Sequence, residues 1–170
     1  MNTFIKCKEN EKVLVSFMIH KDYDINADTL EARVREKIPD NDENESYNLV
    51  YIYYLVDQKM KYPCKESDVL YIGKTNGEKK GKVKSAAFRF VHLKGGQDRK
   101  QNITLEIYYK QGKTIGLDIY EVDDCKKKEK ELRYRFLNEY GALPIADGAA
   151  YSNNKFVTKS VDEEIDEETN

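Results

Sequence analysis

The sequence lacks the features that mark several protein classes. It has no apolar run of about 18 residues, so we expect no membrane-spanning helix. Its first residues lack the basic start, apolar stretch and small-residue cleavage site of a secretory signal. The chain has three cysteines, far apart and without a C-x-x-C spacing, which argues against a disulfide framework and against a zinc site: Cys7, Cys64 and Cys125. We therefore expect a cytoplasmic protein.

The chain also lacks a strong net charge, but its charges are unevenly distributed. Residues 161–169 hold six acids and no base, and without them the net charge of −2 becomes +4. The segment 71–100 contains nine basic and two acidic residues, a local charge of +7. Such a segment can attract an acidic polymer. A solvated, lysine-rich surface is the alternative interpretation.

The first 45 residues are expected to form a short strand-helix appendage. Residues 12–19 are rich in β-branched and aromatic types, which favours a strand. Residues 27–38 place apolar side chains four apart, which predicts an amphipathic helix that ends before Pro39. The run 40–45 is acidic and typical of a linker. These patterns divide the chain into an appendage (1–45), a main domain (46–156) and an acidic tail with the composition of a disordered segment (157–170).

The main domain alternates strand and helix patterns. Strands are predicted at 48–56, 68–73 and 114–122, and helices at 84–94, 102–111 and 126–140. Residues 102–111 satisfy both the helical and the strand period, and we favour a helix because Gly112 can end it. The first two strands can pair as a hairpin with a long connection. The order predicts an α+β fold with a small three-stranded antiparallel sheet flanked by helices.

A cluster of polar and basic residues follows the second strand of the main domain. Gly73 ends this strand and permits a close backbone approach, and Lys74 beside it supplies a point charge. Arg89 and His92 are three residues apart and share a face of the next predicted helix. Phenol, imidazole, guanidinium and ammonium groups suit the surroundings of an attacked phosphate. A strand tyrosine by itself is usually a packing residue.

The last predicted helix carries a glutamate on its apolar side. On a helical wheel Glu129 falls within the apolar stripe, whereas Glu131 points nearly the opposite way. A buried carboxylate is costly unless it is paired or binds a cation. One interpretation is an ion pair with a neighbouring arginine such as Arg133. The other is a ligand of Mg²⁺ or Mn²⁺, which prefer oxygen.

The order of these motifs resembles the GIY-YIG endonuclease superfamily. The matching features are Tyr-Ile-Tyr at 51–53, Tyr-Ile-Gly-Lys-Thr at 71–75, an arginine and a histidine on a helix, a glutamate on a later helix, and a proline followed by an asparagine. The resemblance covers about residues 48–153. It implies a metal-dependent DNA endonuclease of the restriction or phage type, with Mg²⁺ or Mn²⁺ as its cofactor.

The resemblance also implies a role for each matched residue. Tyr53 would be the general base or would orient the water that serves as base, and Tyr71 would help to orient the attacking water. Lys74 matches a basic residue that follows the second motif in several members. Glu129 would bind the single divalent cation, with Glu131 as the alternative ligand.

Three further residues complete the implied site. Arg89 would hold the scissile phosphate and offset its developing negative charge. His92 would assist proton transfer. Asn153 would support the site through hydrogen bonds.

The expected partner is duplex DNA, and symmetric cutting of both strands would suggest a homodimer. The expected contacts to DNA are the remaining basic residues of the segment 71–100: Lys79, Lys80, Lys82, Lys84, Lys94, Arg99 and Lys100. The alternative function is a catalytically inactive module of the same fold that binds nucleic acid or another protein.

Overall fold

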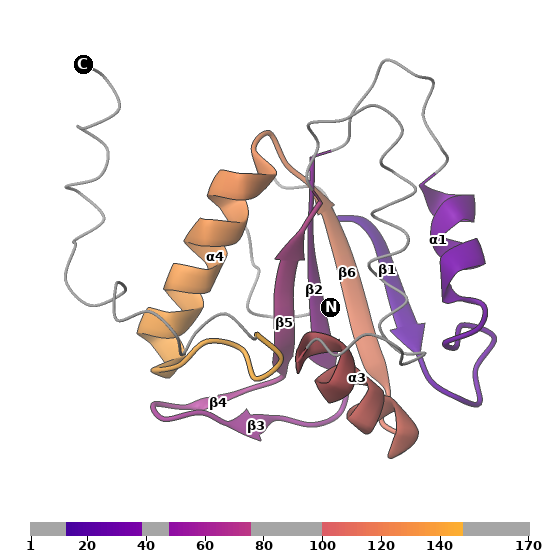
Figure 1. Ribbon diagram of the computed structural model, residues 1–170, viewed down its shortest axis with the longest axis horizontal. Coiled ribbons are helices and arrows are strands. Elements are labelled where there is room, and N and C mark those ends of the chain that lie inside the picture. Colours follow the sequence, from indigo (N-terminus) through magenta and orange to yellow (C-terminus); the bar gives the residue numbers. More distant parts are fainter. Residues whose placement is uncertain (1–12, 39–47, 76–99, 148–170) are drawn as a thin grey trace.

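The computed structural model describes residues 13–38, 48–75 and 100–147, and these form an α+β fold (Figure 1). A four-stranded antiparallel sheet has the order β1-β6-β2-β5, and a separate two-stranded hairpin consists of β3 and β4. The strands are β1 (Val13–Ile19), β2 (Leu49–Leu55), β3 (Met60–Lys61), β4 (Glu66–Ser67), β5 (Val69–Lys74) and β6 (Ile115–Glu121). The helices are α1 (Leu30–Lys37), α3 (Lys100–Lys110) and α4 (Cys125–Tyr140).

Strand β2 lies inside the sheet and is buried along its whole length. It pairs with β5 on one side and with β6 on the other, both antiparallel. The expected hairpin of the first two main-domain strands is therefore confirmed. In its register Tyr53 lies opposite Tyr71, and Tyr51 lies opposite Gly73. The two tyrosine segments of the sequence are thus direct neighbours in the sheet.

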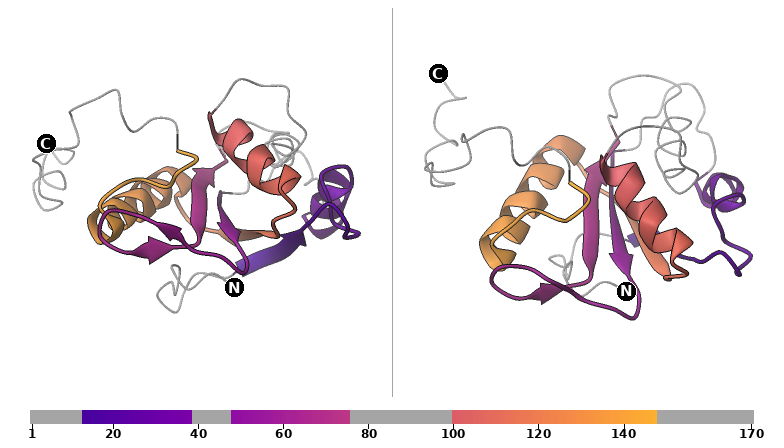
Figure 2. Two further views of the ribbon diagram at one scale, coloured as in Figure 1. Left: turned by 90° about the horizontal axis from the view of Figure 1, so that it is seen from below. Right: turned by 60° about the horizontal axis from the view of Figure 1, so that its bottom comes forward.

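Two hydrophobic cores lie on opposite faces of the sheet. One contains Tyr51, Tyr53 and Leu117 of the sheet together with Leu30 of α1 and Leu105 of α3. The other packs alternate residues of the strands against α4, namely Val50, Ile52, Tyr54, Ile72 and Tyr120 against Cys125, Leu132, Phe136 and Tyr140. This division follows from the period of two along a strand. Strand β5 lies between α3 and α4 in both views of Figure 2.

The expected three-stranded sheet is wrong by one strand. Residues 13–19, expected in an appendage, pair with β6 from Val13 to Ile19. The reason is that β6 is buried on six of its seven residues, and its backbone groups need partners on both sides. Helix α1 follows, and Leu30, Val34 and Ile38 enter the core of the α3 face.

Helix α3 confirms the helical interpretation of residues 102–111. Gly112 has φ +72°, and its amide donates to the carbonyl of Tyr109, so that a glycine ends the helix. The helix predicted at 84–94 lies outside the described residues. Within the part of the chain that the structure describes, we find no helix with the length and hydropathy required to cross a bilayer.

The hairpin β3–β4 was not predicted, because it occupies a polar stretch that has the pattern of a loop. It is docked on the end of α4, where the Cys64 amide donates to the carbonyl of Tyr140 over 3.1 Å. Tyr62 connects it to the sheet: its hydroxyl donates to the Val69 carbonyl over 2.8 Å and accepts from the amide of Ile145. These contacts fix the connection after α4 next to β5.

Candidate active site at the β5–α4 edge

The first part of the site is a layer of three tyrosines on β2 and β5. The ring centroids of Tyr51 and Tyr53 are 6.1 Å apart, and those of Tyr51 and Tyr71 are 6.0 Å apart. Tyr53 is fully buried, Tyr51 is almost fully buried, and Tyr71 is partly exposed. The tyrosine layer, Tyr51–Tyr53–Tyr71, is therefore a packed wall, and only Tyr71 reaches solvent.

Gly73 is required by the close approach of two of these rings. A Cβ atom at this position would lie 2.5 Å from Cζ of Tyr51 and 2.6 Å from Cε1 of Tyr71. These separations are shorter than any van der Waals contact, so a side chain at position 73 would displace the tyrosine layer. The expectation that the glycine permits close approach is consistent with this geometry, and the approaching groups are the tyrosines.

The environment of the tyrosines determines which of them can ionise. Burial, followed by the neighbouring Tyr51 and Tyr71, holds the pKa of Tyr53 well above its ordinary value. Burial also raises the pKa of Tyr71, and the charges of Glu129 and Asp147 add to that rise. A phenolate is disfavoured at both positions, so these hydroxyls suit orientation by hydrogen bonding better than proton removal.

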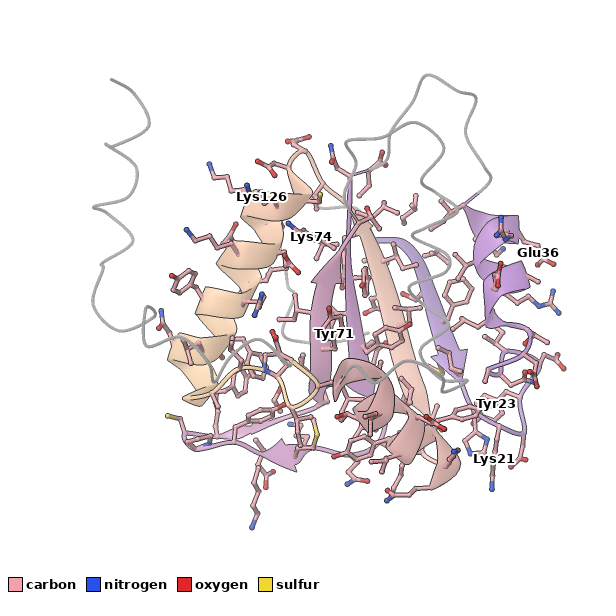
Figure 3. All side chains as sticks on the ribbon, in the orientation of Figure 1. Lys21, Tyr23, Glu36, Tyr71, Lys74 and Lys126 are labelled. Carbon is pink, nitrogen blue, oxygen red and sulfur yellow. The ribbon has the colours of Figure 1, made fainter. Side chains whose placement is uncertain are left out.

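The second part of the site is a lysine–glutamate pair between β5 and α4. Lys74 ends β5, and its Nζ atom lies 3.6 Å from Oε2 of Glu129. The side chain of Glu129 is 17% exposed, whereas that of Glu131 is 57% exposed and pairs with Lys128. The prediction from the helical wheel is thus confirmed: Glu129 faces the sheet and Glu131 faces solvent. Figure 3 shows Lys74 and Tyr71 along β5, next to α4.

Burial is the main influence on Glu129. It raises the pKa of this carboxyl, and the charges of Lys74 and Arg133 offset part of the rise. A carboxylate that is partly desolvated, and that only the nearby charges of Lys74 and Arg133 compensate, is a strong ligand for a metal ion or another positively charged group. The helix that carries it is well defined at both ends, by the Asp124 side chain at the first turn and by Gly141 with φ +78° at the last.

Asp147 and the role of Arg133 were not predicted from the sequence. The Nε atom of Arg133 lies 2.8 Å from Oδ2 of Asp147, an ion pair whose angles are poor for a hydrogen bond, and Asp147 is 5% exposed. Arg133 was considered as a partner of Glu129, but its ion pair is with Asp147 and its charge acts on Glu129 at longer range. The available signal for Asp147 was an acid three residues after Pro144. The sequence interpretation instead placed the supporting polar residue at Asn153.

A pocket of about 270 Å³ opens beside the lysine–glutamate pair. Lys74 and Glu129 form part of its wall, and the other lining residues come from α4 and the connection after it: Lys126, Lys130, Arg133, Tyr134, Leu137 and Leu143. Four of the eight lining side chains are basic and one is acidic, so the pocket carries an excess of positive charge. The charged groups around the pocket would attract an anion to that part of its wall.

The remaining expected residues fall mostly outside the described part of the chain. Arg89, His92 and Asn153 lie in the ranges 76–99 and 148–170, as do Lys79, Lys80, Lys82, Lys84, Lys94 and Arg99. Lys100 begins α3. The structure therefore brings together Tyr71, Lys74 and Glu129 at one edge of the sheet, and it adds Arg133 and Asp147. Tyr53 and Tyr51 lie on the inner strand β2 and are buried on the α3 face, where they reach this edge only through their packing against Tyr71.

The donor set bears on the kind of metal ion the site could hold. Among the described residues no group of three or more His, Cys, Asp or Glu side chains is assembled. Glu129 at the pocket is a single carboxylate, and Asp147 beside it is paired with Arg133. Mg²⁺ is commonly bound by one or two carboxylates, with water and substrate phosphate as the other ligands. The residues fit a cation that is held jointly with a phosphate substrate.

Searches of protein-family models, curated proteins and solved structures find no match to this chain. We therefore base the function on the residues at the β5–α4 edge and on their geometry.

Proposed function

We propose that this protein is a metal-dependent endonuclease that hydrolyses phosphodiester bonds of DNA. The observation that carries the proposal is the position of Glu129. Its partly buried carboxylate lies between the end of β5 and a basic pocket, beside Lys74 and within electrostatic reach of Tyr71. A carboxylate, a cation and a phenol at the edge of an anion-attracting pocket are suited to phosphoryl chemistry.

In this proposal Lys74 and Glu129 act at the pocket, and Tyr71 acts beside it. The Tyr71 hydroxyl orients the attacking water, and Tyr53 with Tyr51 hold that ring in place. Lys74 offsets negative charge that develops on the phosphate. Arg133 and Asp147 position the edge of α4 against β5 and tune the charge at Glu129.

Glu129 is the proposed protein ligand of Mg²⁺ or Mn²⁺. The bound ion would polarise the phosphate and stabilise the leaving oxygen. Glu129 would hold the ion, and Lys74 beside it would contact the substrate phosphate. Arg89 and His92 remain proposed for phosphate binding and proton transfer, and Asn153 for support.

A module that binds nucleic acid without cutting it is the second candidate. The four basic side chains of the pocket favour it, because they would attract a phosphate backbone with or without a metal ion. It differs from the first proposal in the role of Glu129, which a purely binding module does not need.

Incubation of supercoiled plasmid with the purified chain separates the two candidates. The endonuclease proposal expects nicked or linear product with Mg²⁺ or Mn²⁺ and none with EDTA. Salt-sensitive binding without product in any divalent metal would contradict it and support the binding module. Nicked product alone would indicate that one strand is cut at a time, and linear product would favour the homodimer.

A further inference from the structure

One side of α4 forms a row of basic residues, and the proposed chemistry uses only the last of them, Arg133, as a positioning residue. Lys126, Lys130 and Arg133 follow one another at spacings of four and three, and all three line the pocket beside Glu129. Residues at these spacings share one face of a helix. In Figure 3 Lys126 lies at the same end of α4 as Lys74, where β5 finishes.

We propose that this face of α4 is a binding site for the phosphate backbone of one nucleic-acid strand. The inference rests on the proposed function, and it names α4 as the surface along which the strand leaves Glu129. Lys126 to Arg133 spans seven residues, about 10 Å of helix, which exceeds the separation of two neighbouring phosphates along one strand. The row therefore has the length to contact successive phosphates.

We place the nucleic-acid strand along the side of α4, because a carboxylate of the protein already caps the N-terminus of this helix. The Asp124 carboxylate accepts hydrogen bonds from the amides of Lys126 and Lys127, at 2.9 and 3.0 Å. The amides that could bind an anion at a helix start are thus used by a carboxylate of the chain itself. Phosphate groups are left with the ammonium and guanidinium groups along the pocket.

The far end of the pocket differs in character from the basic end. Leu137 and Leu143 line it with Tyr134, whose ring centroid lies 5.9 Å from the Lys130 ammonium. Apolar and aromatic groups beside a row of cations suit the sugar of a nucleotide whose phosphate contacts the lysines. A small inorganic anion would use only the basic end.

The test compares two double variants of the same helix in binding to a labelled DNA duplex, with EDTA present so that no strand is cut. Lys126→Gln with Lys130→Gln removes two charges from the pocket. Lys128→Gln with Arg135→Gln removes two charges from the opposite side of α4, where these residues pair with Glu131 and Glu139. Both variants change the net charge equally, so they should bind DNA alike if only the overall charge matters.

The pocket variant is expected to bind the duplex at least about tenfold more weakly than the control variant. The slope of log affinity against log salt should fall by about two, since two phosphate contacts are lost. Equal weakening in both variants would mean that only overall charge matters and would overturn the inference. Wild-type affinity in both variants would overturn it as well, because neither side of α4 would then contribute to binding.

Two further outcomes distinguish a failure of the α4 binding site from a failure of the endonuclease proposal. Binding that weakens as expected in a protein that never cleaves DNA would remove the endonuclease proposal and leave the α4 site. Cleavage by the wild type, together with equal affinity of the two double variants for the duplex, would keep the endonuclease proposal and remove the α4 site. The pair is repeated after deletion of residues 161–170; if the difference vanishes there, the pocket binds the acidic tail in place of DNA, which also overturns the inference.

Discussion

Two carboxylates on the α4 side of the sheet have opposite surroundings. Asp118 of β6 is fully buried and accepts hydrogen bonds from three hydroxyls: Ser16 at 2.6 Å, Tyr54 at 3.3 Å and Tyr120 at 3.4 Å. Glu129 of α4 lies 3.6 Å from one lysine and borders a pocket. The first carboxylate is enclosed by its own protein, whereas the second is reachable from outside.

The difference separates a structural acid from a candidate functional one. Hydroxyls surround Asp118 and tie β1, β2 and β6 together at one point, so its contribution is to stability. Glu129 is desolvated without that network, and a carboxylate in such a position gains from an incoming cation. Partial burial beside a pocket therefore marks Glu129 as the candidate functional residue, whereas complete burial marks Asp118 as a structural one.

The largest expected effect is a loss of stability when Asp118, the structural carboxylate, is replaced. Asp118→Ala should lower the free energy of unfolding by about 2–3 kcal/mol, because three hydroxyls lose their acceptor. Chemical denaturation measures the loss. The cleavage rate per folded molecule should stay within about threefold of the wild type, since Asp118 does not line the pocket. A selective loss of cleavage in folded Asp118→Ala would remove the distinction between the two acids.

Two glycines provide a matched pair of somewhat smaller effects. A Cβ atom on Gly116 would lie 2.2 Å from Cζ of Tyr54, beside Asp118, and one on Gly73 would lie 2.5 Å from Cζ of Tyr51 in the tyrosine layer. Gly73→Ala and Gly116→Ala should each cost about 1–3 kcal/mol of stability by overpacking, measured by thermal or chemical unfolding.

Only Gly73→Ala should also lower cleavage by the folded protein, by about 10- to 100-fold, because it displaces the ring of Tyr71. Equal cleavage by the two alanine variants at matched folded concentration would show that the tyrosine layer has no part in the reaction.

A shift of the pH profile tests the contact between Lys74 and Glu129. Burial raises the pKa of Glu129, and the charge of Lys74 acts against that rise, so Lys74→Met should raise it further. The acidic limb of cleavage against pH, at a subsaturating Mn²⁺ concentration, should then move to higher pH. Lys65→Met is the matched control, because Lys65 pairs with Glu139 at the other end of α4. An acidic limb that stays in place, or moves to lower pH, contradicts the assigned contact.

The smallest expected effect is on stability at Glu129 itself. Its raised pKa means that the folded state favours the protonated carboxyl, so the wild type loses stability as pH rises through the range of that pKa. Glu129→Gln lacks this loss, and its unfolding midpoint relative to the wild type should increase from acidic to neutral pH. Glu131→Gln, on the exposed side of the same helix, is the reference. A relative midpoint that falls over the same range would show that ionised Glu129 stabilises the fold.

The sequence predicted those elements and residues whose pattern is local. Helix α4 and the inward direction of Glu129 followed from the helical period, and the pairing of β2 with β5 followed from two strand patterns close in the sequence. The register that sets Tyr53 opposite Tyr71 was not predicted. The fourth strand was missed because the pairing of residues 13–19 with β6 spans about a hundred positions, and local patterns do not encode partners at that distance.

The Arg133–Asp147 pair was missed for a related reason. Asp147 reaches Arg133 only because the connection after α4 is held against β5, where the Ala146 amide donates to the Leu70 carbonyl over 3.0 Å. That docking depends on a hairpin, β3–β4, which has no clear signal in a polar loop.

Cleavage of supercoiled plasmid by Glu129→Gln in Mg²⁺ or Mn²⁺, at the same folded concentration as wild type and Glu131→Gln, tests the central claim most directly. We predict a loss of at least about 100-fold for Glu129→Gln, in a variant whose unfolding midpoint at neutral pH is not lowered, and a wild-type rate for Glu131→Gln. Cleavage by Glu129→Gln at the wild-type rate would contradict the claim that the β5–α4 edge is the hydrolytic site.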